Sequence, residues 1–470
     1  MPPQSRHMSA NKMWSSGPLV LVSFLFVLLA PILASPAVTH LKRGNTFSVP
    51  LVHNADRPRH GPSEILRTLK KFNLEIPNGL QNAVDKHRAK MALLAAPKDV
   101  YTDVTEGGTG AVSANSKDGD LLWLAPISVG TPPQELFVDL DTGSTDSWFF
   151  STDTKPSEVD GQTLWEPNKS STSSVIPGCS WSIIYGDWST SSGKCYTDTL
   201  MLGNLSIPNM TIESAESVSD MFTSTSYMSG LVGLAWPDLK QTIPPQKALI
   251  EFLPEVLDEP VFTVDFRHNS SDGSFNFGYI DDKLYESDIV YTDVDTSSGF
   301  WGVKNTAFGI GGENLTYSFL DPKPVIIDTG TTLLFAPEAS VDTYYAKVPG
   351  ANFSMQEYGY VVPCDVELPD FLWEFSDKAG NVVKGAVPGA YLVYAHTSDE
   401  LCFAGLQSIS SFTGVEGIFG DIFLKSGFFA FDIKGKRFGA ASKPLNISNG
   451  KRDMSLHGDI YNRPVKTIFI

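Results

Sequence analysis

Short apolar runs separated by turn residues dominate the chain from Leu121 onward. The runs are bounded by Gly, Pro, Asp and Ser, a pattern that is typical of β-strands joined by turns. Strands are predicted in this way at 136–140, 181–185, 261–266, 325–327 and 428–433. Helical patterns are limited to 63–72, 80–96, 246–256 and 338–348. The chain is therefore predicted to be mostly β.

This β-rich region repeats one order of elements. In each half, a short apolar strand runs into Asp-Thr-Gly and a hydroxyl residue, at 141–144 and again at 328–331. Each half later contains two apolar residues followed by glycine, at 231–233 and at 418–420. Because 470 residues are many for one hydrophobic core, the repeat predicts two related β-rich lobes.

The amino-terminal region contains one long apolar run, 19–34, behind Arg6 and Lys12 and ahead of small residues. This arrangement predicts a secretory signal peptide that is cut after Ala34 or Ala37. A membrane anchor is the alternative, but the run is shorter than the ~20 apolar residues that span a bilayer. No later segment is long and apolar enough to span one.

The formal net charge of −18 is distributed unevenly. Residues 38–98 contain 11 Lys and Arg against 4 Asp and Glu, whereas the chain from 99 onward contains 22 against 49. A basic segment thus precedes a strongly acidic body, which would repel nucleic acid and anionic lipid. Such a body is suited to acidic surroundings, where protonation relieves its self-repulsion. Between the two regions, 103–120 is rich in Gly, Ser and Thr and is predicted to be an exposed linker.

Cysteines and glycosylation sequons fit a secreted protein. Four cysteines allow three pairings, and sequence proximity favours Cys179 with Cys195 and Cys364 with Cys402. A zinc site is not expected, because the chain lacks Cys-x-x-Cys and has only three His after residue 98. Candidate glycosylation sites are Asn168, Asn204, Asn209, Asn269, Asn314, Asn352 and Asn446.

The two Asp-Thr-Gly turns carry the candidate chemistry. If the turns face each other, Asp141 and Asp328 lie too close for both to ionise easily, so they share one proton. The ionised carboxylate can then take a proton from water, and the protonated one can donate to a peptide carbonyl. The residues expected to support these two carboxylates are Thr142, Gly143, Ser144, Thr329, Gly330 and Thr331.

Three alternative assignments of chemistry fit the chain less well. The turns could be ordinary Asx-turns at strand ends, but two such turns, each behind an apolar strand and before a hydroxyl residue, rarely arise by chance. A phosphoryl-acceptor Asp would need a phosphate-binding glycine loop, which the chain lacks. A serine hydrolase is not expected, because there is no Gly-x-Ser-x-Gly motif and His is scarce.

These segments closely resemble pepsin-like aspartic proteases of the secreted, fungal type. Residues 125–134, 141–144 and Trp148 resemble the amino-terminal lobe of that family, and 328–331 resemble its second active-site turn. Residues 418–421 and the Phe-Asp pair at 431–432 resemble its carboxy-terminal signature. The resemblance covers about 121–444. It implies a bilobal, mostly β acid-protease fold in which an extended polypeptide lies in a cleft between the lobes.

The resemblance also implies a β-hairpin flap over the cleft. Residues 182–187 match it, so Tyr185 is expected to contact substrate, and Asp187 is a candidate acceptor for a Lys or Arg side chain beside the scissile bond. Trp188 departs from the small residue that is usual there, so the specificity of the flap tip is open. The residues expected to bind substrate are Tyr185, Gly186, Asp187, Trp148, Leu231 and Ile326.

The two cysteine pairs relate differently to the family. Cys364 and Cys402 resemble its carboxy-lobe disulfide. Cys179 and Cys195 instead bracket the flap hairpin, whereas pepsin's first disulfide closes a loop nearer the first active-site turn. A bond between them would hold the base of the hairpin together.

The basic segment matches the place of a zymogen propeptide in this family, where a Lys pairs with the catalytic carboxylates. Lys70 and Lys71 are the candidates. The charge contrast predicts a tight complex near neutral pH that loosens as carboxylates protonate, with self-processing between 92 and 120. The expected organisation is a signal peptide at 1–35, a propeptide and linker at 36–110, an amino-terminal lobe at 111–288, a carboxy-terminal lobe at 289–446 and a tail at 447–470.

Together these features predict a secreted aspartic endopeptidase that works without cofactor or metal, with a vacuolar location as the alternative. Its expected partners are polypeptide substrates and its own propeptide, with no nucleic acid and, after signal removal, no membrane. A monomer is expected. The competing interpretation is an inactive relative that only binds peptides, against which the intact turns argue. Charged residues after 450 argue against a GPI anchor.

Overall fold

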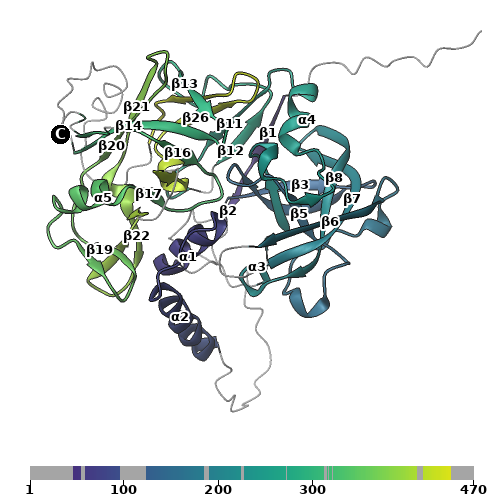
Figure 1. The fold of residues 1–470 in the computed structure, drawn as a ribbon, viewed down its shortest axis with the longest axis horizontal. Helices are drawn as coiled ribbons and strands as arrows, with labels where there is room; N and C mark the ends of the chain where they lie inside the picture. Colours follow the sequence, from purple (N-terminus) through teal and green to yellow (C-terminus); the bar gives the residue numbers. More distant parts are fainter. Residues whose placement is uncertain are drawn as a thin grey trace, which may run out of the picture. The chain divides into compact units, whose positions relative to one another are not determined.

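The computed structural model describes residues 46–53, 59–95, 123–184, 190–223, 227–270, 273–311, 315, 317–319, 321–409 and 416–445 (Figure 1). Strands make up most of the regular structure, which confirms the mostly β prediction. The expected signal peptide, the linker at 103–120, the flap residues Tyr185, Gly186 and Asp187, and the tail lie outside these residues. Within the described part, no helix has the length and apolar character needed to cross a membrane.

A nine-stranded sheet carries the first Asp-Thr-Gly turn. Its strands in spatial order are β10 (Thr242–Ile243), β6 (Ser174–Ile184), β7 (Thr190–Leu202), β8 (Leu205–Val218), β5 (Ser147–Phe150), β9 (Gly230–Gly233), β4 (Gln134–Asp141), β3 (Trp123–Val129) and β2 (Val52–His53). Strand β4 ends at Asp141 and pairs in parallel with β9, with Asp141 opposite Gly233. The first turn therefore begins where β4 stops.

A fourteen-stranded sheet carries the second turn. Its main path is β1 (Phe47–Pro50), β12 (Ser274–Phe277), β11 (Val261–Asp265), β26 (Phe428–Asp432), β27 (Arg437–Ala441), β13 (Val290–Asp295), β14 (Gly302–Ile310), β16 (Pro324–Ile327), β25 (Gly417–Phe419), β17 (Leu334–Ala336) and β24 (Leu406–Ser408). Strands β15 (Tyr317–Ser318), β20 (Phe371–Ser376) and β21 (Val382–Val387) join it off this path. Strand β16 runs parallel to β25 and leads directly into Asp328.

The remaining elements are one small sheet and short helices. The small sheet consists of β18 (Asn352–Ser354), β19 (Gly359–Pro363), β23 (Leu401–Ala404) and β22 (Val393–His396). The α-helices are α1 (Gly61–Lys71), α2 (Leu80–Ala95), α3 (Asp220–Thr223), α4 (Leu249–Val256), α5 (Glu338–Tyr345) and α6 (Asp421–Leu424). The 3-10 turns are η1 (Pro156–Glu158), η2 (Pro167–Lys169), η3 (Pro237–Leu239) and η4 (Gly389–Leu392). All four predicted helical segments thus form helices, with ends shifted by up to three residues.

The two halves contain the same parallel pair of strands, which confirms the prediction of two related β-rich lobes. In each, the strand before Asp-Thr-Gly runs parallel to the strand that contains the two apolar residues of the apolar-apolar-Gly element. The glycines are required by space: a Cβ on Gly233 would lie 2.4 Å from the carbonyl carbon of Thr145. On Gly420 it would lie 2.1 Å from the carbonyl oxygen of Thr331. Strands β11 and β12, which precede the expected lobe boundary at 288, pair with the sheet of the second half.

Aromatic residues connect the two halves. Trp301 is fully buried and donates its indole N–H to the carbonyl oxygen of Leu234 at 2.9 Å. Its ring centroid lies 4.9 Å from that of Trp236, 5.7 Å from that of Phe262 and 5.0 Å from that of Phe431. Buried aromatic rings contribute large apolar areas, so this cluster fixes one half against the other near the two turns.

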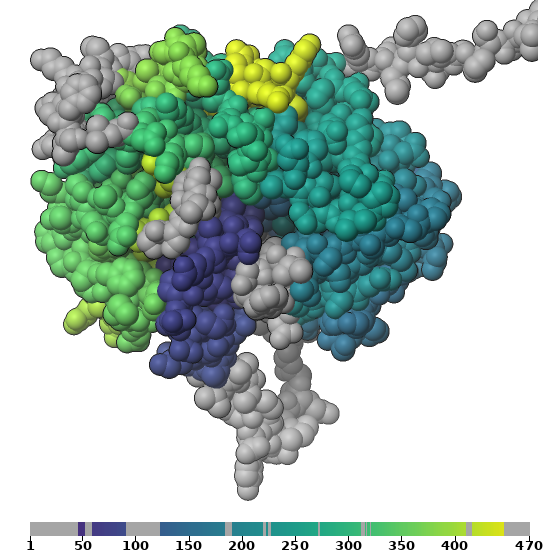
Figure 2. Space-filling view, viewed as in Figure 1, coloured from purple at the N-terminus to yellow at the C-terminus, as the bar shows by residue number. Residues whose placement is uncertain are grey.

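The basic amino-terminal segment is built into both sheets. Strand β1 pairs with β12 and β2 pairs with β3, so the segment supplies one strand to each. Helix α1 buries Ile65, Leu66 and Leu69 and exposes little of its length. A Cβ on Gly61 would lie 2.3 Å from the ring of Phe403, so the helix start packs directly on β23. Figure 2 shows α1 and α2, in purple, lying between the green and teal surfaces.

Both predicted cysteine pairs are disulfide-bonded. Cys179 and Cys195 have Cα atoms 5.4 Å apart and bridge β6 and β7, one residue beyond the pairing of Ser180 with Lys194. Cys364 and Cys402 have Cα atoms 4.9 Å apart. The first bridge therefore lies across the hairpin whose tip is the expected flap.

Replacing Cys179 and Cys195 together by alanine should destabilise the nine-stranded lobe. The bridge spans 16 residues, for which loop closure contributes about 3 kcal/mol to the free energy of unfolding. The same change at Cys364 and Cys402 opens a span of 38 residues and is expected to remove about 4 kcal/mol. Denaturant titration of the two variants beside the wild type measures both losses. Losses below about 1 kcal/mol for both pairs would contradict the loop-closure account.

Candidate active site

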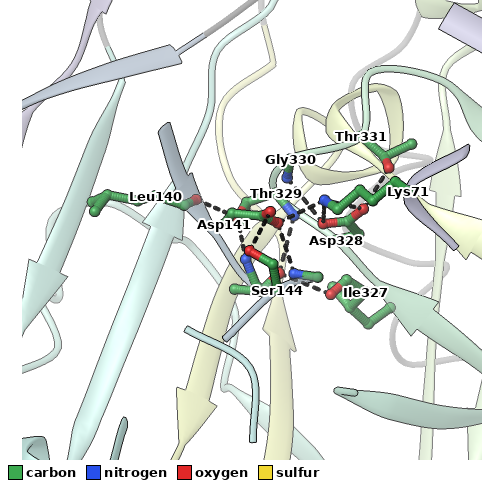
Figure 3. A network of polar contacts seen from close by, with 11 residues as sticks. Lys71, Leu140, Asp141, Ser144, Ile327, Asp328, Thr329, Gly330 and Thr331 are labelled. Carbon is green, nitrogen blue, oxygen red and sulfur yellow. Dashed lines mark hydrogen bonds and ion pairs between the residues drawn. The ribbon is translucent and has the colours of Figure 1, made fainter. Parts of the chain in front are cut away.

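The first candidate carboxylate is held by the turn that follows it (Figure 3). Asp141 Oδ1 accepts the backbone N–H of Gly143 at 2.8 Å, and Oδ2 accepts the hydroxyl of Ser144 at 2.7 Å. The Asp141 side chain is fully buried. Donors on both oxygens fix the plane of the carboxylate.

The second turn repeats this arrangement. Asp328 Oδ1 accepts the N–H of Gly330 at 3.0 Å, and Oδ2 accepts the hydroxyl of Thr331. Asp328 is also fully buried. The two carboxylates therefore have matching donors at matching positions, which gives the site an approximate twofold symmetry.

Exchanged threonine hydrogen bonds lock the turns together. The N–H of Thr142 donates to Thr329 Oγ1 at 2.9 Å, and the N–H of Thr329 donates to Thr142 Oγ1 at 3.0 Å. Each hydroxyl then donates across the interface, to the carbonyl oxygens of Ile327 at 2.9 Å and Leu140 at 2.6 Å. Since all four bonds join the two halves, neither turn can shift without breaking bonds to the other.

The glycine of each turn makes room for the opposite carboxylate. A Cβ on Gly143 would lie 2.4 Å from Asp328 Oδ1. A Cβ on Gly330 would lie 2.5 Å from Asp141 Oδ1. Real Cβ atoms do not approach oxygen this closely, so only glycine permits the two carboxylates to come together.

A lysine from helix α1 lies between the carboxylates. Lys71 Nζ donates to Asp141 Oδ1 at 2.7 Å and to both oxygens of Asp328 at 2.9 Å. Lys71 comes from the last turn of α1, and the next residue, Phe72, places its ring centroid 5.3 Å from that of Phe300. Of the two lysines that the sequence offered, Lys71 is the one in contact with both carboxylates.

The three charged groups shift each other's pKa values. Burial alone would lower the pKa of Lys71, but Asp141 and Asp328 outweigh burial and raise it above the ordinary range of lysine. Burial raises the pKa of Asp328 to about 6, with Lys71 opposing the rise and Asp141 adding to it. Burial acts in the same direction on Asp141, but Lys71 and hydrogen bonds hold its pKa below the usual value. The two carboxyl groups are therefore unequal, and one accepts a proton well before the other.

A cavity of about 510 Å³ lies beside the carboxylates. The predicted residues Trp148 and Leu231 line it together with Ile183, Phe222 and Met228. Ile326, also predicted to bind substrate, is 1% exposed and pairs with Ile418 in the sheet beneath the second turn. The apolar part of the cavity wall suits apolar substrate side chains, and Arg67, Asp146 and Gln241 line the rest.

A third buried acid lies near the pair and was not among the residues expected from the sequence. Asp139 is 8% exposed and lines the same cavity, two residues before Asp141 on the same face of β4. Burial and the neighbouring Asp141 raise the pKa of Asp139 to about 8, although Lys71 opposes the rise. The sequence contains a sign of this residue, because Asp139 is the one acid in the otherwise apolar strand predicted at 136–140.

Among the described residues, one group of potential metal ligands comes together: Cys364, His396 and Cys402. Both sulfurs are in a disulfide, so they offer no thiolate to a metal ion.

Comparison with known proteins agrees with this geometry. Two β-rich lobes that bring two buried Asp-Thr-Gly carboxylates together are the arrangement of an aspartic protease. A family model described as eukaryotic aspartyl protease matches residues 122–443. The chain belongs to that family, and the enzyme is an aspartic endopeptidase, a hydrolase.

Fungal relatives match over most of the chain. Endothiapepsin from Cryphonectria parasitica is 38% identical over 406 residues, which cover 86% of this chain and 90% of the relative. Aspartic protease PEP1 from Arthroderma benhamiae is 36% identical over 407 residues, with coverages of 84% and 92%. Aspergillopepsin-1 from Aspergillus oryzae is 39% identical over 336 residues, with coverages of 71% and 82%.

Substituting Asn for each acid in turn should show that Asp139 contributes far less to kcat than Asp141 and Asp328 do. At pH 4 Asp139 is protonated, because its pKa is raised to about 8, so Asp139→Asn is expected to change kcat by no more than about threefold. Asp141→Asn and Asp328→Asn are each expected to lower kcat by about a thousandfold or more, because they remove a proton donor or acceptor. Steady-state cleavage of one peptide by all three variants measures this. An Asp139→Asn loss as large as that of the other two would show that Asp139 transfers protons.

Proposed function

We propose that Asp141 and Asp328 hydrolyse peptide bonds by sharing one proton and activating a water molecule. The observation that carries the proposal is the position of Lys71 Nζ, within 2.9 Å of both carboxylates. A polar group that small can contact both acids at once, and a water molecule of similar size can take the same place once Lys71 leaves. Matching Gly and hydroxyl donors on the two carboxylates support the same assignment.

The proposed reaction moves protons within the pair. The ionised carboxylate takes a proton from water as the water oxygen attacks the carbonyl carbon, and the protonated carboxyl gives its proton to the carbonyl oxygen. The tetrahedral intermediate then collapses: the carboxyl that took the proton from water gives it to the amide nitrogen, the other carboxylate takes a proton from a hydroxyl of the intermediate, and the C–N bond breaks, leaving a carboxyl and an amine. The pair returns to its singly protonated state. Because the titration belongs to the pair, neither acid has a permanent role.

We also propose that residues 36–110 form a propeptide that keeps the enzyme latent. Helix α1 covers the carboxylates with a cation, and β1 and β2 tie the segment to both sheets. The uncovered pair holds one proton, whereas docking of Lys71 favours two ionised carboxylates. Docking therefore releases a proton, so the complex weakens as the pH falls. The excess of acidic residues after 99 acts in the same direction.

Secretion to the extracellular space is the proposed destination, and the vacuole is the alternative that cell fractionation distinguishes. The apolar leader, the two disulfides and the sequons support export. The sequon asparagines that lie in the described part of the chain are all exposed: Asn168, Asn204, Asn209, Asn269 and Asn352. We propose these as glycosylation sites, together with Asn314 and Asn446, which lie outside the described residues. A monomer is the proposed working state.

The proposed function is tested by cleavage of unfolded globin between pH 2 and 7. Wild-type protein that has lost its propeptide is expected to cleave best at acidic pH, where the pair holds one proton. Asp141→Asn should show no cleavage above background at any pH. Absence of cleavage by a correctly processed wild type would contradict the proposal, as would full activity in Asp141→Asn.

Lys71→Met should weaken latency. Without the cation, docking no longer depends on ionised carboxylates, so processing is expected to begin about one pH unit or more nearer to neutral than in wild type. Lys86→Met, at an exposed position of α2, removes the same charge from the segment and serves as the control. Gel analysis of zymogen samples across pH 3–7 gives the midpoint of processing. Equal midpoints for the two variants would show that Lys71 does not keep the zymogen inactive.

A further inference from the structure

Three charged residues meet in the interior beside the first turn. Lys240 Nζ donates to Glu213 Oε1 and lies 3.6 Å from Asp146 Oδ1. All three side chains are at least 95% buried. Glu213 comes from β8, Lys240 directly follows η3, and Asp146 is the fifth residue after Asp141. We call these three residues the Lys240 triad.

Hydrogen bonds connect the Lys240 triad to the segment that leaves the first turn. Asp146 Oδ1 accepts the N–H of Gln241 at 3.0 Å, and Glu213 Oε1 accepts the N–H of Ser147 at 3.4 Å. The Asp146 carbonyl oxygen accepts the N–H of Gly233 at 3.0 Å. The triad thus joins β8 and the loop after η3 to the backbone that follows Asp141.

Two further contacts reach the turn itself from Ala235 and Trp236, which directly precede η3. Thr145 Oγ1 donates to the carbonyl oxygen of Trp236 at 2.7 Å. The N–H of Ala235 donates to the carbonyl oxygen of Ser144 at 2.9 Å, and Ser144 in turn donates to Asp141. A displacement of the loop 235–241 would therefore move the donor that orients the Asp141 carboxylate.

The triad contains two acids and one cation, so its charge depends on pH. Burial raises the pKa of Glu213 to about 8, with Lys240 opposing the rise and Asp146 adding to it. Burial likewise raises the pKa of Asp146, with Lys240 opposing. Glu213 Oε2 has no hydrogen-bond partner within the described part of the chain. The groups that face one another here are the triad residues themselves, with the backbone N–H groups of Ser147 and Gln241.

The raised pKa values of Glu213 and Asp146 make the stability of the fold depend on pH. An acid whose pKa is raised by folding keeps a proton that the unfolded chain releases, so stability falls as the pH rises from about 4.5, the usual value for Glu, toward 8. In the wild type, Lys240 balances one carboxylate, which leaves one acid to keep its proton. Without Lys240, both acids would have to keep their protons, and the loss of stability with pH would be steeper.

We propose that Lys240 is a positioning residue for the first Asp-Thr-Gly turn, and that the Lys240 triad sets the upper pH limit at which this turn is held in its active geometry. The proposal rests on the proposed function of Asp141. It concerns a role for Lys240, Glu213 and Asp146 that the catalytic pair does not require for its chemistry.

The test compares pH profiles of kcat for processed enzymes. At pH 3.5 Lys240→Met is expected to stay within about threefold of wild type, because both acids are protonated. Its activity should then fall at a pH about one unit below that of the wild type. Lys247→Met removes a lysine that pairs with Glu255 at the surface and is the matched control, with an unchanged profile.

Two variants that carry Glu213→Gln test the proposal even if Lys240→Met alone does not fold. Glu213→Gln removes the acid that keeps its proton, so activity should persist about one unit further toward neutral pH. Lys240→Met combined with Glu213→Gln again leaves one acid that must keep its proton. In this double variant kcat should therefore fall at the same pH as in the wild type. KM should change less than kcat in every variant, since Lys240 and Glu213 are not among the residues that line the cavity and act through the position of the turn.

Three outcomes would overturn the proposal: a Lys240→Met profile equal to that of Lys247→Met, no upward shift in Glu213→Gln, or no recovery in the double variant. A uniform loss at every pH in Lys240→Met would also overturn it, because a purely structural lysine gives that result. Failure of the proposed function looks different, since the wild type would then cleave nothing or Asp141→Asn would remain active.

Discussion

The exchanged hydrogen bonds between Thr142 and Thr329 hold two carboxylates side by side in the interior, and this forced proximity governs the rest of the molecule. Two buried like charges repel, so the pair must hold a proton or bind a cation. The groups around Asp141 and Asp328 make this proximity possible. The turn glycines leave room for the opposite carboxylate, and the hydroxyls of Ser144 and Thr331 fix the carboxylate planes. The parallel strands beneath bring the two turns together.

The same constraint explains why a lysine is an effective proposed latch. Lys71 satisfies both acids at once, which neither a neutral side chain nor water can do when both are ionised. The segment that carries it is fixed by strands in both sheets and by the packing of Gly61 on Phe403. The proposed latency and the proposed catalysis thus depend on one feature, the need of two buried carboxylates for a proton or a cation, and pH decides which of the two meets it.

Further acids lie buried in the same lobe. Asp139 and Asp146 of the Lys240 triad both line the cavity, and burial raises the pKa of Asp139 and of Glu213 to about 8. Each keeps a proton that water would remove near neutral pH, so the lobe as a whole is built for acidic surroundings. In the second half, Lys443 is buried against Asp265 at 2.9 Å, and burial lowers the pKa of Lys443 to about 8 although Asp265 opposes the shift.

The sequence by itself determined the features that depend on near neighbours. Strand periodicity, the Asp-Thr-Gly turns, the paired apolar-apolar-Gly elements and the local cysteine pairs are all readable within a few dozen residues, and the repeat predicted the two-lobe fold. Tertiary structure decided what depends on distant contacts. Lys71 and Lys70 are adjacent in the chain, and only the packing of α1 selects Lys71 as the lysine that contacts both carboxylates. Lys71 and Asp328 are 257 residues apart, and Lys240 and Glu213 meet through a loop and a strand with no shared motif. Local patterns record which face of a strand is buried, but the partner of a buried charge is fixed only when separate elements pack.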